Sequence, residues 1–304
     1  MTEQALTGVA TCATVDLLGY YGDAFAELAP DLVLLRPEEV TDPAAVSFVF
    51  TFVPDDDTFA PYPNLRAIFS AGAGTDAIMA CPSRPDHVPV YRVEDPDQAL
   101  QMAGFAAFHV VWHHRRMGQY LDDQAQQAWN PRNHRMSPAS KRVGVMGFGL
   151  MGREVARSLV TLGYDVAGYS RRLPEPLEDG VEAFTDGGLD HFLARSDILI
   201  NVLPLTPQTE GILNADTFAK LPKGAALIHI GRGGHLVEQD LIAALDSGHL
   251  SGASLDVFDT EPLPAGHAFW SHPQIFVTPH VASASEDRAV VASIVDQLRT
   301  LASA

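Results

Sequence analysis

The chain has 304 residues, of which 46% are hydrophobic and 19% charged, and its 38 acidic against 20 basic residues give a formal net charge of −18. This composition supports a sizeable core and excludes a largely disordered chain, and the length is typical of two domains. A surface this acidic repels phosphate backbones and anionic lipid heads, so nucleic acids and membrane surfaces are disfavoured as partners.

The cysteine content and the apolar runs indicate a cytoplasmic protein. Cys12 and Cys81 are the two cysteines of the sequence and are too few for a disulfide framework. No uncharged apolar run reaches the ~18 residues of a membrane span, and residues 1–5 lack the basic and apolar regions of a signal peptide. We expect a reduced protein without a membrane segment and without a metal site.

The first hundred residues alternate short apolar runs with polar, proline-rich joints. Residues 45–53 are dense in β-formers and predict a strand, and residues 65–70 predict a second strand that leads into the glycine-containing loop 71–76. Apolar residues at helical spacing predict one long, largely buried helix over residues 98–120. Residues 130–141, with two prolines and four basic residues, predict an exposed connector.

From residue 142 onward, strand and helix patterns alternate. This alternation predicts a parallel sheet covered by helices on both faces. The expected strands are 143–146, 165–169, 198–203, 226–230, 254–258 and 275–278, and the expected helices are 151–162, 209–220 and 237–247. A last helix is expected to open with a capping box formed by Ser283 and Glu286.

A glycine-rich loop follows the first of these strands and opens a helix. Gly147 permits a tight turn, Gly149 lets a pyrophosphate approach the backbone, and Gly152 allows close packing of helix on strand. The amides at the helix start, at Leu150 and Met151, then face the phosphates. The pattern alone also fits a structural turn or the loop of some methyltransferases, but the strand before it and the helix after it favour dinucleotide binding.

The end of the second strand indicates which dinucleotide is bound. NAD sites usually place an Asp or Glu there, whereas this chain has Ser170, Arg171 and Arg172. Guanidinium groups form charge-assisted, often bidentate hydrogen bonds to phosphate oxygens, so the segment favours NADPH, with its 2′-phosphate, over NADH. The alternative is a pair of solvated surface arginines.

Three chemistry-bearing residues follow three later strands. Arg232 is flanked by glycines and is suited to bind a substrate carboxylate, while Glu261 and His280 follow the next two strands. A carboxylate beside an imidazole stabilises the protonated ring and fixes its orientation. Each residue alone also fits a structural role. Their joint placement favours an acid–base pair beside a carboxylate anchor.

Several segments together resemble the D-isomer-specific 2-hydroxyacid dehydrogenases. They are the glycine loop 147–152, Leu-Pro-Leu-Thr-Pro-Gln-Thr at 203–209, Gly-Arg-Gly at 231–233, Leu-Asp-Val-Phe at 255–258, Glu-Pro-Leu at 261–263 and Thr-Pro-His-Val-Ala at 278–282. The pair Ser170-Arg171 is similar to that of the NADPH-dependent glyoxylate/hydroxypyruvate reductase branch.

The resemblance implies an α/β fold of two Rossmann-like domains with parallel sheets. The dinucleotide-binding domain, residues 102–282, is expected to be inserted into a substrate domain made of residues 1–101, to which the C-terminal helix, residues 283–304, returns. The implied reaction is the NADPH-dependent reduction of a small 2-oxo acid, such as glyoxylate, hydroxypyruvate or a larger analogue, by a homodimer. A nucleotide-sensing, corepressor-type protein on the same fold is the alternative, and it does not need all three catalytic residues.

The resemblance also implies a role for each matching residue. Arg232 binds the substrate carboxylate, His280 is the acid/base, and Glu261 supports His280. The implied cofactor residues, besides the glycine loop and Ser170–Arg172, are Leu203, Pro204, Thr209, Ile230, Gly231, Asp256 and Ala282. Backbone amides of Ala73 and Gly74 are implied to contact the substrate.

This chain departs from the branch pattern at two places that bear on the site. Gly231 stands where an alanine is usual, which loosens the turn before Arg232. Phe50 and Phe52 stand where the branch tends to carry a tryptophan that lines the substrate pocket. Phe52 is therefore an expected substrate contact, and the difference affects which 2-oxo acid is bound more than the chemistry.

Overall fold

The computed structural model of the protein describes residues 6–131, 136–172 and 178–302. The chain divides into two compact units, one made of residues 1–95 and 285–304 and the other of residues 96–284. The functional boundaries expected at residues 102 and 282 stay predictions. The connector expected at 130–141 is described in part, since residues 132–135 lie outside the described residues.

The first unit is a parallel sheet with helices on its two faces. Its described elements are β1 (Thr7–Ala10), α1 (Leu17–Leu28), β2 (Val33–Leu35), β3 (Val46–Thr51), β4 (Ala67–Ser70), α2 (Asp76–Ala80), β5 (Val90–Tyr91) and α9 (Asp287–Ala302). The strands of this described part pair in the order β2-β1-β3-β4-β5, all in parallel.

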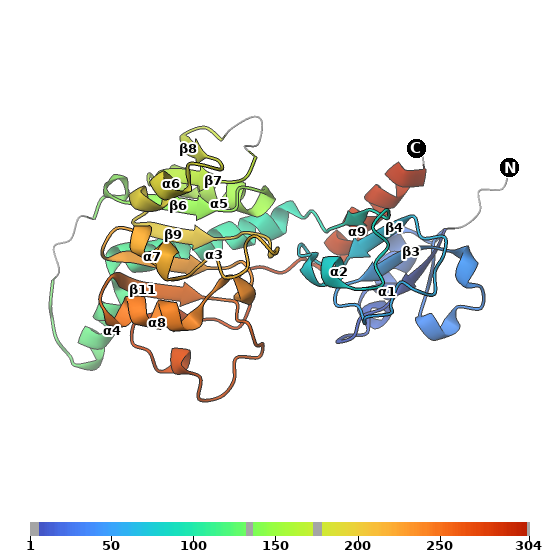
Figure 1. Ribbon diagram of the computed structural model, residues 1–304, viewed down its shortest axis with the longest axis horizontal. Helices are drawn as coiled ribbons and strands as arrows, with labels where there is room; N and C mark the ends of the chain where they lie inside the picture. The colour runs from blue at the N-terminus through green and yellow to red at the C-terminus, as the bar shows by residue number, and fades with distance from the viewer. Residues whose placement is uncertain (1–5, 132–135, 173–177, 303–304) are drawn as a thin grey trace. The chain divides into compact units, whose positions relative to one another are not determined.

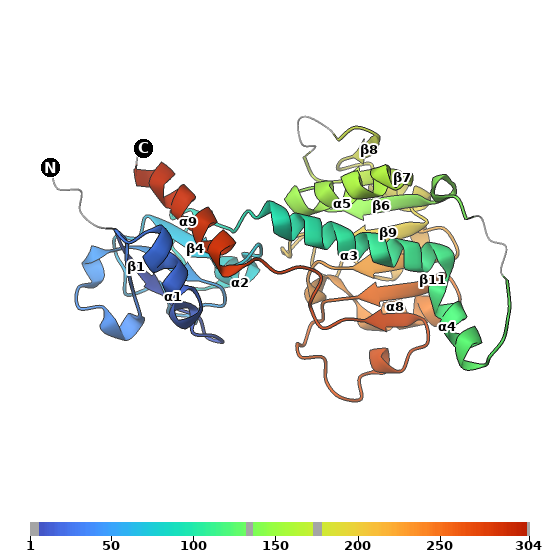
Figure 2. The same ribbon diagram turned by 180° about the vertical axis from the view of Figure 1, so that it is seen from behind.

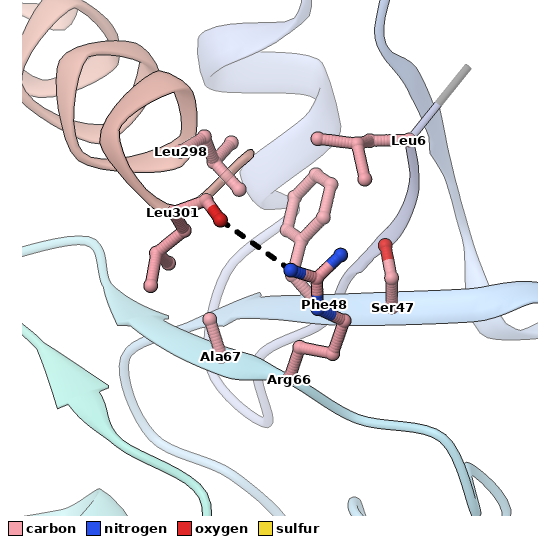
Figure 3. Close-up of a pocket in the computed structure, with 7 residues that line it drawn as sticks. All are labelled: Leu6, Ser47, Phe48, Arg66, Ala67, Leu298 and Leu301. Atoms are coloured by element: carbon pink, nitrogen blue, oxygen red, sulfur yellow. Dashed lines mark hydrogen bonds between the residues drawn. The ribbon is translucent and has the colours of Figure 1, made fainter. Parts of the chain in front are cut away.

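The C-terminal helix α9 supplies much of the first unit's core, although more than 180 residues separate it from β5. Apolar residues of α9, among them Val291 and Ile294, pack with Phe25 of α1 and with the sheet. Figure 2 shows α1 and α9 on the same face of this sheet. The guanidinium of Arg66 donates from Nη2 to the carbonyl oxygen of Leu301 at 3.4 Å, beside a small apolar cavity of about 20 Å³ (Figure 3).

The second unit holds a larger parallel sheet. Its described elements are α3 (Pro96–Arg115), α4 (Met117–Ala125), β6 (Arg142–Met146), α5 (Leu150–Thr161), β7 (Asp165–Tyr169), β8 (Val181–Phe184), α6 (Leu189–Arg195), β9 (Ile198–Asn201), α7 (Ala215–Lys220), β10 (Ala225–His229), α8 (Glu238–Asp246), β11 (Leu250–Leu255) and β12 (Ile275–Val277). In this described part the strand order is β12-β11-β10-β9-β6-β7-β8 (Figure 1).

Helices cover both faces of this sheet, as the alternating sequence pattern predicts. One face packs against α3 and α5 through residues such as Val110 and Leu159, and the other packs against α6, α7 and α8 through residues such as Phe192, Phe218 and Leu241. Figures 1 and 2 show the two layers from opposite sides. The predicted α/β class with two parallel sheets is confirmed.

Several element boundaries differ from the sequence-based expectation. The helix expected over 98–120 is two helices, because Arg116 between α3 and α4 has φ of 53°, in the left-handed region that ends a right-handed helix. Strand β8 was not expected. The helix expected from residue 209 begins at Ala215, where the side chain of Asn214 caps it by accepting from the Thr217 N–H.

The ends of two further elements also differ, and both lie near predicted site residues. The strand expected over 254–258 ends at Leu255, and the side chain of the next residue, Asp256, binds a neighbouring loop. The last helix begins at Asp287 and not within the expected capping box of Ser283 and Glu286. None of the helices in the described residues is both long and apolar enough to cross a membrane.

Candidate active site

The predicted cofactor and catalytic residues of the second unit lie at one edge of its sheet. The glycine loop follows β6, Ser170–Arg172 follow β7, Leu203 follows β9, and Arg232 follows β10. Glu261 follows β11 and His280 follows β12. Because all these strands are parallel, their carboxyl ends and the loops that follow them share one edge, which is where open α/β sheets bind ligands.

The glycine loop has the shape that a pyrophosphate requires. Gly147 has φ of +107°, and a Cβ on it would lie 2.7 Å from the backbone of Val202. A Cβ on Gly152 would lie 1.8 Å from the carbonyl oxygen of Gly147, so the helix packs directly against the loop. Beside Gly149 there is open space, with no atom within 4 Å of a Cβ built there. The start of α5 therefore offers amides to a phosphate over an open cradle.

A pocket of about 490 Å³ adjoins the end of β7. It is lined by Ser170, Arg171, Arg172 and Asp186. Both arginine side chains are exposed, and within the described residues no ion pair joins either of them to an acidic side chain. The donor set fits a 2′-phosphate, and the residues present therefore fit NADPH.

Asp186 is a pocket residue that sequence reasoning missed. It follows β8, a strand that the sequence pattern did not indicate, and its carboxylate accepts a hydrogen bond from the Tyr169 hydroxyl at 3.2 Å. This carboxylate and burial raise the pKa of Tyr169, with burial the larger cause. The only sequence signal for this strand is Val181 and Phe184, two β-formers at the ends of a short and partly exposed segment. Among the described residues, the predicted phosphate site thus contains one negative group besides its two positive ones.

His280 and Glu261 form a direct pair. Nδ1 of His280 lies 2.7 Å from Oε2 of Glu261, while Oε1 of Glu261 accepts a hydrogen bond from the Phe258 N–H at 2.9 Å. Glu261 is thereby fixed from two sides, and Nε2 is the ring nitrogen of His280 that points away from the carboxylate. The His280 side chain is 46% exposed, so that nitrogen can reach a ligand.

The backbone of His280 is held in a strained conformation by Asp256. His280 has φ of 54°, which is uncommon outside glycine, and its N–H donates to the carbonyl oxygen of Asp256 at 2.8 Å. The buried Asp256 carboxylate accepts from the Thr278 hydroxyl at 2.6 Å and from the N–H groups of Val281 and Ala282 at 3.0 and 2.9 Å. The role implied for Asp256 in the cofactor site stays a prediction, while its contacts hold the loop that carries His280.

The Arg232 turn packs directly against the loop that carries Glu261. A Cβ on Gly233 would lie 1.9 Å from the backbone carbon of Phe258, so glycine is required at this contact. Phe258 is the residue whose N–H holds Glu261. The Arg232 guanidinium donates from Nη1 to the carbonyl oxygen of Gly231 at 2.8 Å. Arg232, Glu261 and His280 are thus carried by loops that touch one another.

The remaining predicted cofactor residues of this unit line the same edge. Thr209 closes the loop after β9, because its hydroxyl donates to the Pro204 carbonyl oxygen at 2.7 Å and accepts from the Thr206 N–H at 2.8 Å. Leu203 is partly buried, whereas Ile230 and Ala282 are buried. These placements agree with the predicted edge, and the cofactor roles themselves stay predictions.

The predicted substrate residues of the first unit follow β3 and β4. The loop after β4 is held by Ser70, whose hydroxyl donates to the Gly74 carbonyl oxygen at 2.7 Å and accepts from the Gly72 N–H at 3.2 Å. Phe52 is 39% exposed, whereas Phe50 is fully buried, where it packs edge-on against Phe25. Of the two phenylalanines, Phe52 is therefore the one able to contact a substrate.

A buried histidine lies on α3, the helix that packs across the sheet of the second unit. His109 is 1% exposed, and burial lowers its pKa to about 4, although the negative charge of Asp256 acts in the opposite direction. His109 is therefore neutral at physiological pH, and it packs against the rings of Phe105 and Phe276.

Comparisons with known proteins place this geometry in a family. Residues 107–282 match the family model described as D-isomer specific 2-hydroxyacid dehydrogenase, NAD binding domain. Glyoxylate/hydroxypyruvate reductase A of Photorhabdus laumondii is 39% identical over 262 residues, which cover 84% of this chain and 82% of that protein.

Two solved structures show the same fold over nearly the whole chain. A D-isomer specific 2-hydroxyacid dehydrogenase from Xanthobacter autotrophicus, in complex with NADPH and MES, has a TM-score of 0.90 at 37% identity and covers 98% of this chain and 95% of that one. An NADPH-dependent glyoxylate/hydroxypyruvate reductase from Sinorhizobium meliloti, in complex with NADP and sulfate, has a TM-score of 0.88 at 34% identity with the same coverage. This chain therefore belongs to the D-isomer-specific 2-hydroxyacid dehydrogenase family.

Proposed function

We propose that the protein is an NADPH-dependent reductase of small 2-oxo acids, such as glyoxylate, hydroxypyruvate or a larger analogue. The observation that carries the proposal is the His280–Glu261 pair, with Nδ1 and Oε2 2.7 Å apart, on a loop system shared with Arg232. The family and the NADPH-bound relatives support the same activity. A purely nucleotide-sensing protein does not require this pair beside an arginine anchor.

Each of the three residues has one task in the reaction. When bound, NADPH supplies the hydride that reduces the carbonyl carbon. Arg232 binds the substrate carboxylate, for which the planar guanidinium is suited because it can form two parallel hydrogen bonds. His280 donates a proton from Nε2 to the carbonyl oxygen, and one hydride and one proton together give the 2-hydroxy acid. Glu261 holds Nδ1 and stabilises the protonated ring before that transfer.

The glycine loop and the pocket beyond β7 are the proposed cofactor site. Gly147, Gly149 and Gly152 would hold the pyrophosphate, and Ser170, Arg171 and Arg172 would hold the 2′-phosphate. Ala73 and Gly74 of the first unit are proposed to offer backbone amides to the substrate carboxylate. NADH lacks the phosphate that the two arginines would bind, so it is the less favoured cofactor.

The proposal extends to the state of the protein in the cell. We propose a homodimer in the cytoplasm. The net charge of −18 supports the further proposal that the protein has no nucleic-acid partners. Phe108 and Val111 of α3 are 53% and 40% exposed, and these apolar side chains support a dimer contact within residues 106–112. Light scattering of the purified protein, at several concentrations, measures the oligomer directly.

The activity is tested by following NADPH oxidation with a panel of 2-oxo acids. Purified protein is mixed with NADPH and with glyoxylate, hydroxypyruvate or phenylpyruvate, and the absorbance of NADPH is recorded. We expect turnover with at least one of them, and the ranking identifies the substrate class. Absence of turnover with every acid, together with measurable NADPH binding, would favour the sensing function instead.

A further inference from the structure

Three buried polar side chains lie together under the Arg232 turn, and the reaction proposed above does not use them. They are Asn201 at the end of β9, His229 at the end of β10, and His235 in the short 3₁₀ helix Gly233–His235. All three are 0% exposed. Nδ2 of Asn201 lies 3.1 Å from Nδ1 of His229 and 3.1 Å from Nδ1 of His235.

The backbone of Arg232 determines where the protons of this cluster lie. The Arg232 N–H points to Nδ1 of His235 at 3.2 Å, and because a backbone N–H can only donate, that nitrogen must accept. The proton of the neutral His235 ring is therefore on Nε2. The neighbouring Asn201 nitrogen then also donates to Nδ1 of His235, so the oxygen of the carboxamide faces the other way, where it accepts a long bond of 3.4 Å from the Leu203 N–H.

The second hydrogen of the Asn201 carboxamide determines the state of His229. An NH₂ group carries two hydrogens, and the second one points to Nδ1 of His229, which must also accept. Burial and, to a lesser extent, the neighbouring His235 ring lower the pKa of His229 to about 3, so His229 is neutral under physiological conditions. Both rings therefore keep Nδ1 unprotonated and the carboxamide keeps one orientation.

This cluster also accounts for the glycine at position 231. A Cβ on Gly231 would lie 3.0 Å from Nδ2 of Asn201 and 3.1 Å from Nδ1 of His235. Both distances are tighter than ordinary van der Waals contact, and both neighbours are fully buried and hydrogen-bonded. An alanine at this position, which is usual in the branch, would require the turn or the cluster to shift by a few tenths of an ångström. Gly231 therefore lets the Arg232 turn lie directly on the buried side chains.

We propose that Asn201, His229 and His235 are positioning residues that set the backbone of the Arg232 turn, and through it the guanidinium that binds the substrate carboxylate. This inference rests on the proposed function, because it takes Arg232 to be the carboxylate anchor. Asn201 links the turn to the loop that starts at Leu203, so the same carboxamide connects the proposed substrate anchor with the proposed cofactor loop.

The test compares two substitutions of His235. His235→Asn keeps an acceptor close to the position of Nδ1, whereas His235→Leu fills the space without an acceptor and leaves the Arg232 N–H unsatisfied. We expect H235L to raise the KM of the 2-oxo acid roughly tenfold, as the loss of one buried hydrogen bond predicts, with a smaller change in kcat and unchanged NADPH affinity. We expect H235N to retain a KM close to that of the wild type.

A matched control separates this effect from general loss of packing. His114 is a buried histidine in the same unit whose Nδ1 pairs with the Tyr164 hydroxyl at 3.1 Å, just before β7 and away from the carboxyl edge. His114→Leu removes a buried imidazole hydrogen bond as H235L does, so we expect it to lower stability without changing the KM of the 2-oxo acid. An equal rise of KM in H235L and H235N, or no rise in H235L, would overturn the proposal.

Two further measurements do not depend on the folding of H235L. Gly231→Ala places a methyl group between the turn and the cluster and should raise the KM of the 2-oxo acid; a wild-type KM in G231A would contradict the proposal.

Nitrogen-15 NMR of histidine-labelled wild-type protein, assigned with H235N, should show unprotonated Nδ1 in His235, and a proton there would contradict the hydrogen-bond scheme. If the wild type reduces no 2-oxo acid, the proposed function itself fails. If the wild type is active but H235L and H235N have the same KM for the 2-oxo acid, only the positioning role is refuted.

Discussion

The proposed role of Arg232 as the carboxylate anchor can be tested by a conservative substitution. Arg232→Lys keeps the positive charge but loses the planar pair of donors that fits a carboxylate. We expect kcat/KM for the 2-oxo acid to fall by roughly 10- to 100-fold, since a charge-assisted hydrogen bond contributes about 1.5–3 kcal/mol. NADPH affinity, measured by fluorescence titration, should be retained. Near wild-type efficiency in R232K would refute the carboxylate anchor.

Substitutions in the His280–Glu261 pair distinguish proton transfer by His280 from positioning by Glu261. His280→Gln removes the donor, and general acid catalysis typically contributes about 10²–10⁴-fold, so we expect kcat to fall within that range. Glu261→Gln keeps a group that can contact Nδ1 but removes the negative charge that stabilises the protonated ring. Its kcat should fall less than that of H280Q. Steady-state rates for both variants check the order, and a larger loss in E261Q would assign the chemistry to Glu261.

At this scale the sequence predicts that the three proposed reactive residues share one edge of the sheet, but it does not predict how they are held. Arg232, Glu261 and His280 were identified from the strands they follow, because parallel strands bring their carboxyl ends to one edge. The contacts of Asp256 with the loop of His280, and the close approach of Gly233 to Phe258, depend on side-chain and backbone positions that sequence spacing does not specify.

At the scale of elements, we expect the loops after β7 and β8 to set the cofactor preference together. Arg171 and Arg172 should favour NADPH over NADH by at least about tenfold in kcat/KM, since each contacting arginine contributes a charge-assisted bond to the 2′-phosphate. Replacing both arginines by alanine should remove most of this preference by weakening NADPH, with little change for NADH. Steady-state kinetics with both cofactors measure the ratio, and equal use of both by the wild type would refute the phosphate site.

The Asp186 carboxylate in the same pocket allows a control whose expected effect on the NADPH preference is opposite to that of the arginine substitutions. Asp186→Asn removes a negative group near the 2′-phosphate, so the preference for NADPH should rise by about two- to fivefold, the range of an exposed charge interaction. A fall in that preference would mean that Asp186 acts by orienting the arginines.

The elements show where sequence patterns are informative and where they are not. The central strands β6, β7, β9 and β10 are mostly apolar and almost fully buried, and they lie close to where the pattern predicted them. The edge strand β8 has one exposed and three half-buried residues, so its pattern is weak, and the pocket residue after it was missed. The long helix was divided by the backbone conformation of Arg116, which no periodicity indicates.

At the scale of the molecule, buried neutral histidines make stability depend on pH. Burial lowers the pKa of His109 to about 4 and that of His229 to about 3, and burial also lowers the pKa of His113. In the unfolded chain these rings bind protons below about pH 6.5, whereas in the folded chain they do not, so acid favours unfolding. His109 and His229 are both fully buried and together should reduce the free energy of unfolding by about 2.7 kcal/mol per pH unit between roughly pH 6 and pH 4.

Urea denaturation at a series of pH values checks this expectation. The free energy of unfolding should be nearly constant above pH 7 and should fall as the pH drops below about 6.5. His109→Gln removes one of the titrating rings, so its free energy of unfolding should fall less steeply with acid. A wild-type stability that stays constant down to pH 5 would show that these histidines are protonated in the folded chain.

Helix α9 connects the order of synthesis to the order of folding. A ribosome makes residues 96–284 before it makes Asp287–Ala302, so the second unit has its whole sheet available while the first unit still lacks a buried layer of its core. Val291 and Ile294, at 0% and 1% exposure, belong to that layer. During translation the part of this apolar face that α9 covers therefore stays exposed until the chain returns to it, and a chaperone that binds nascent apolar segments should engage residues 6–95 rather than the larger unit.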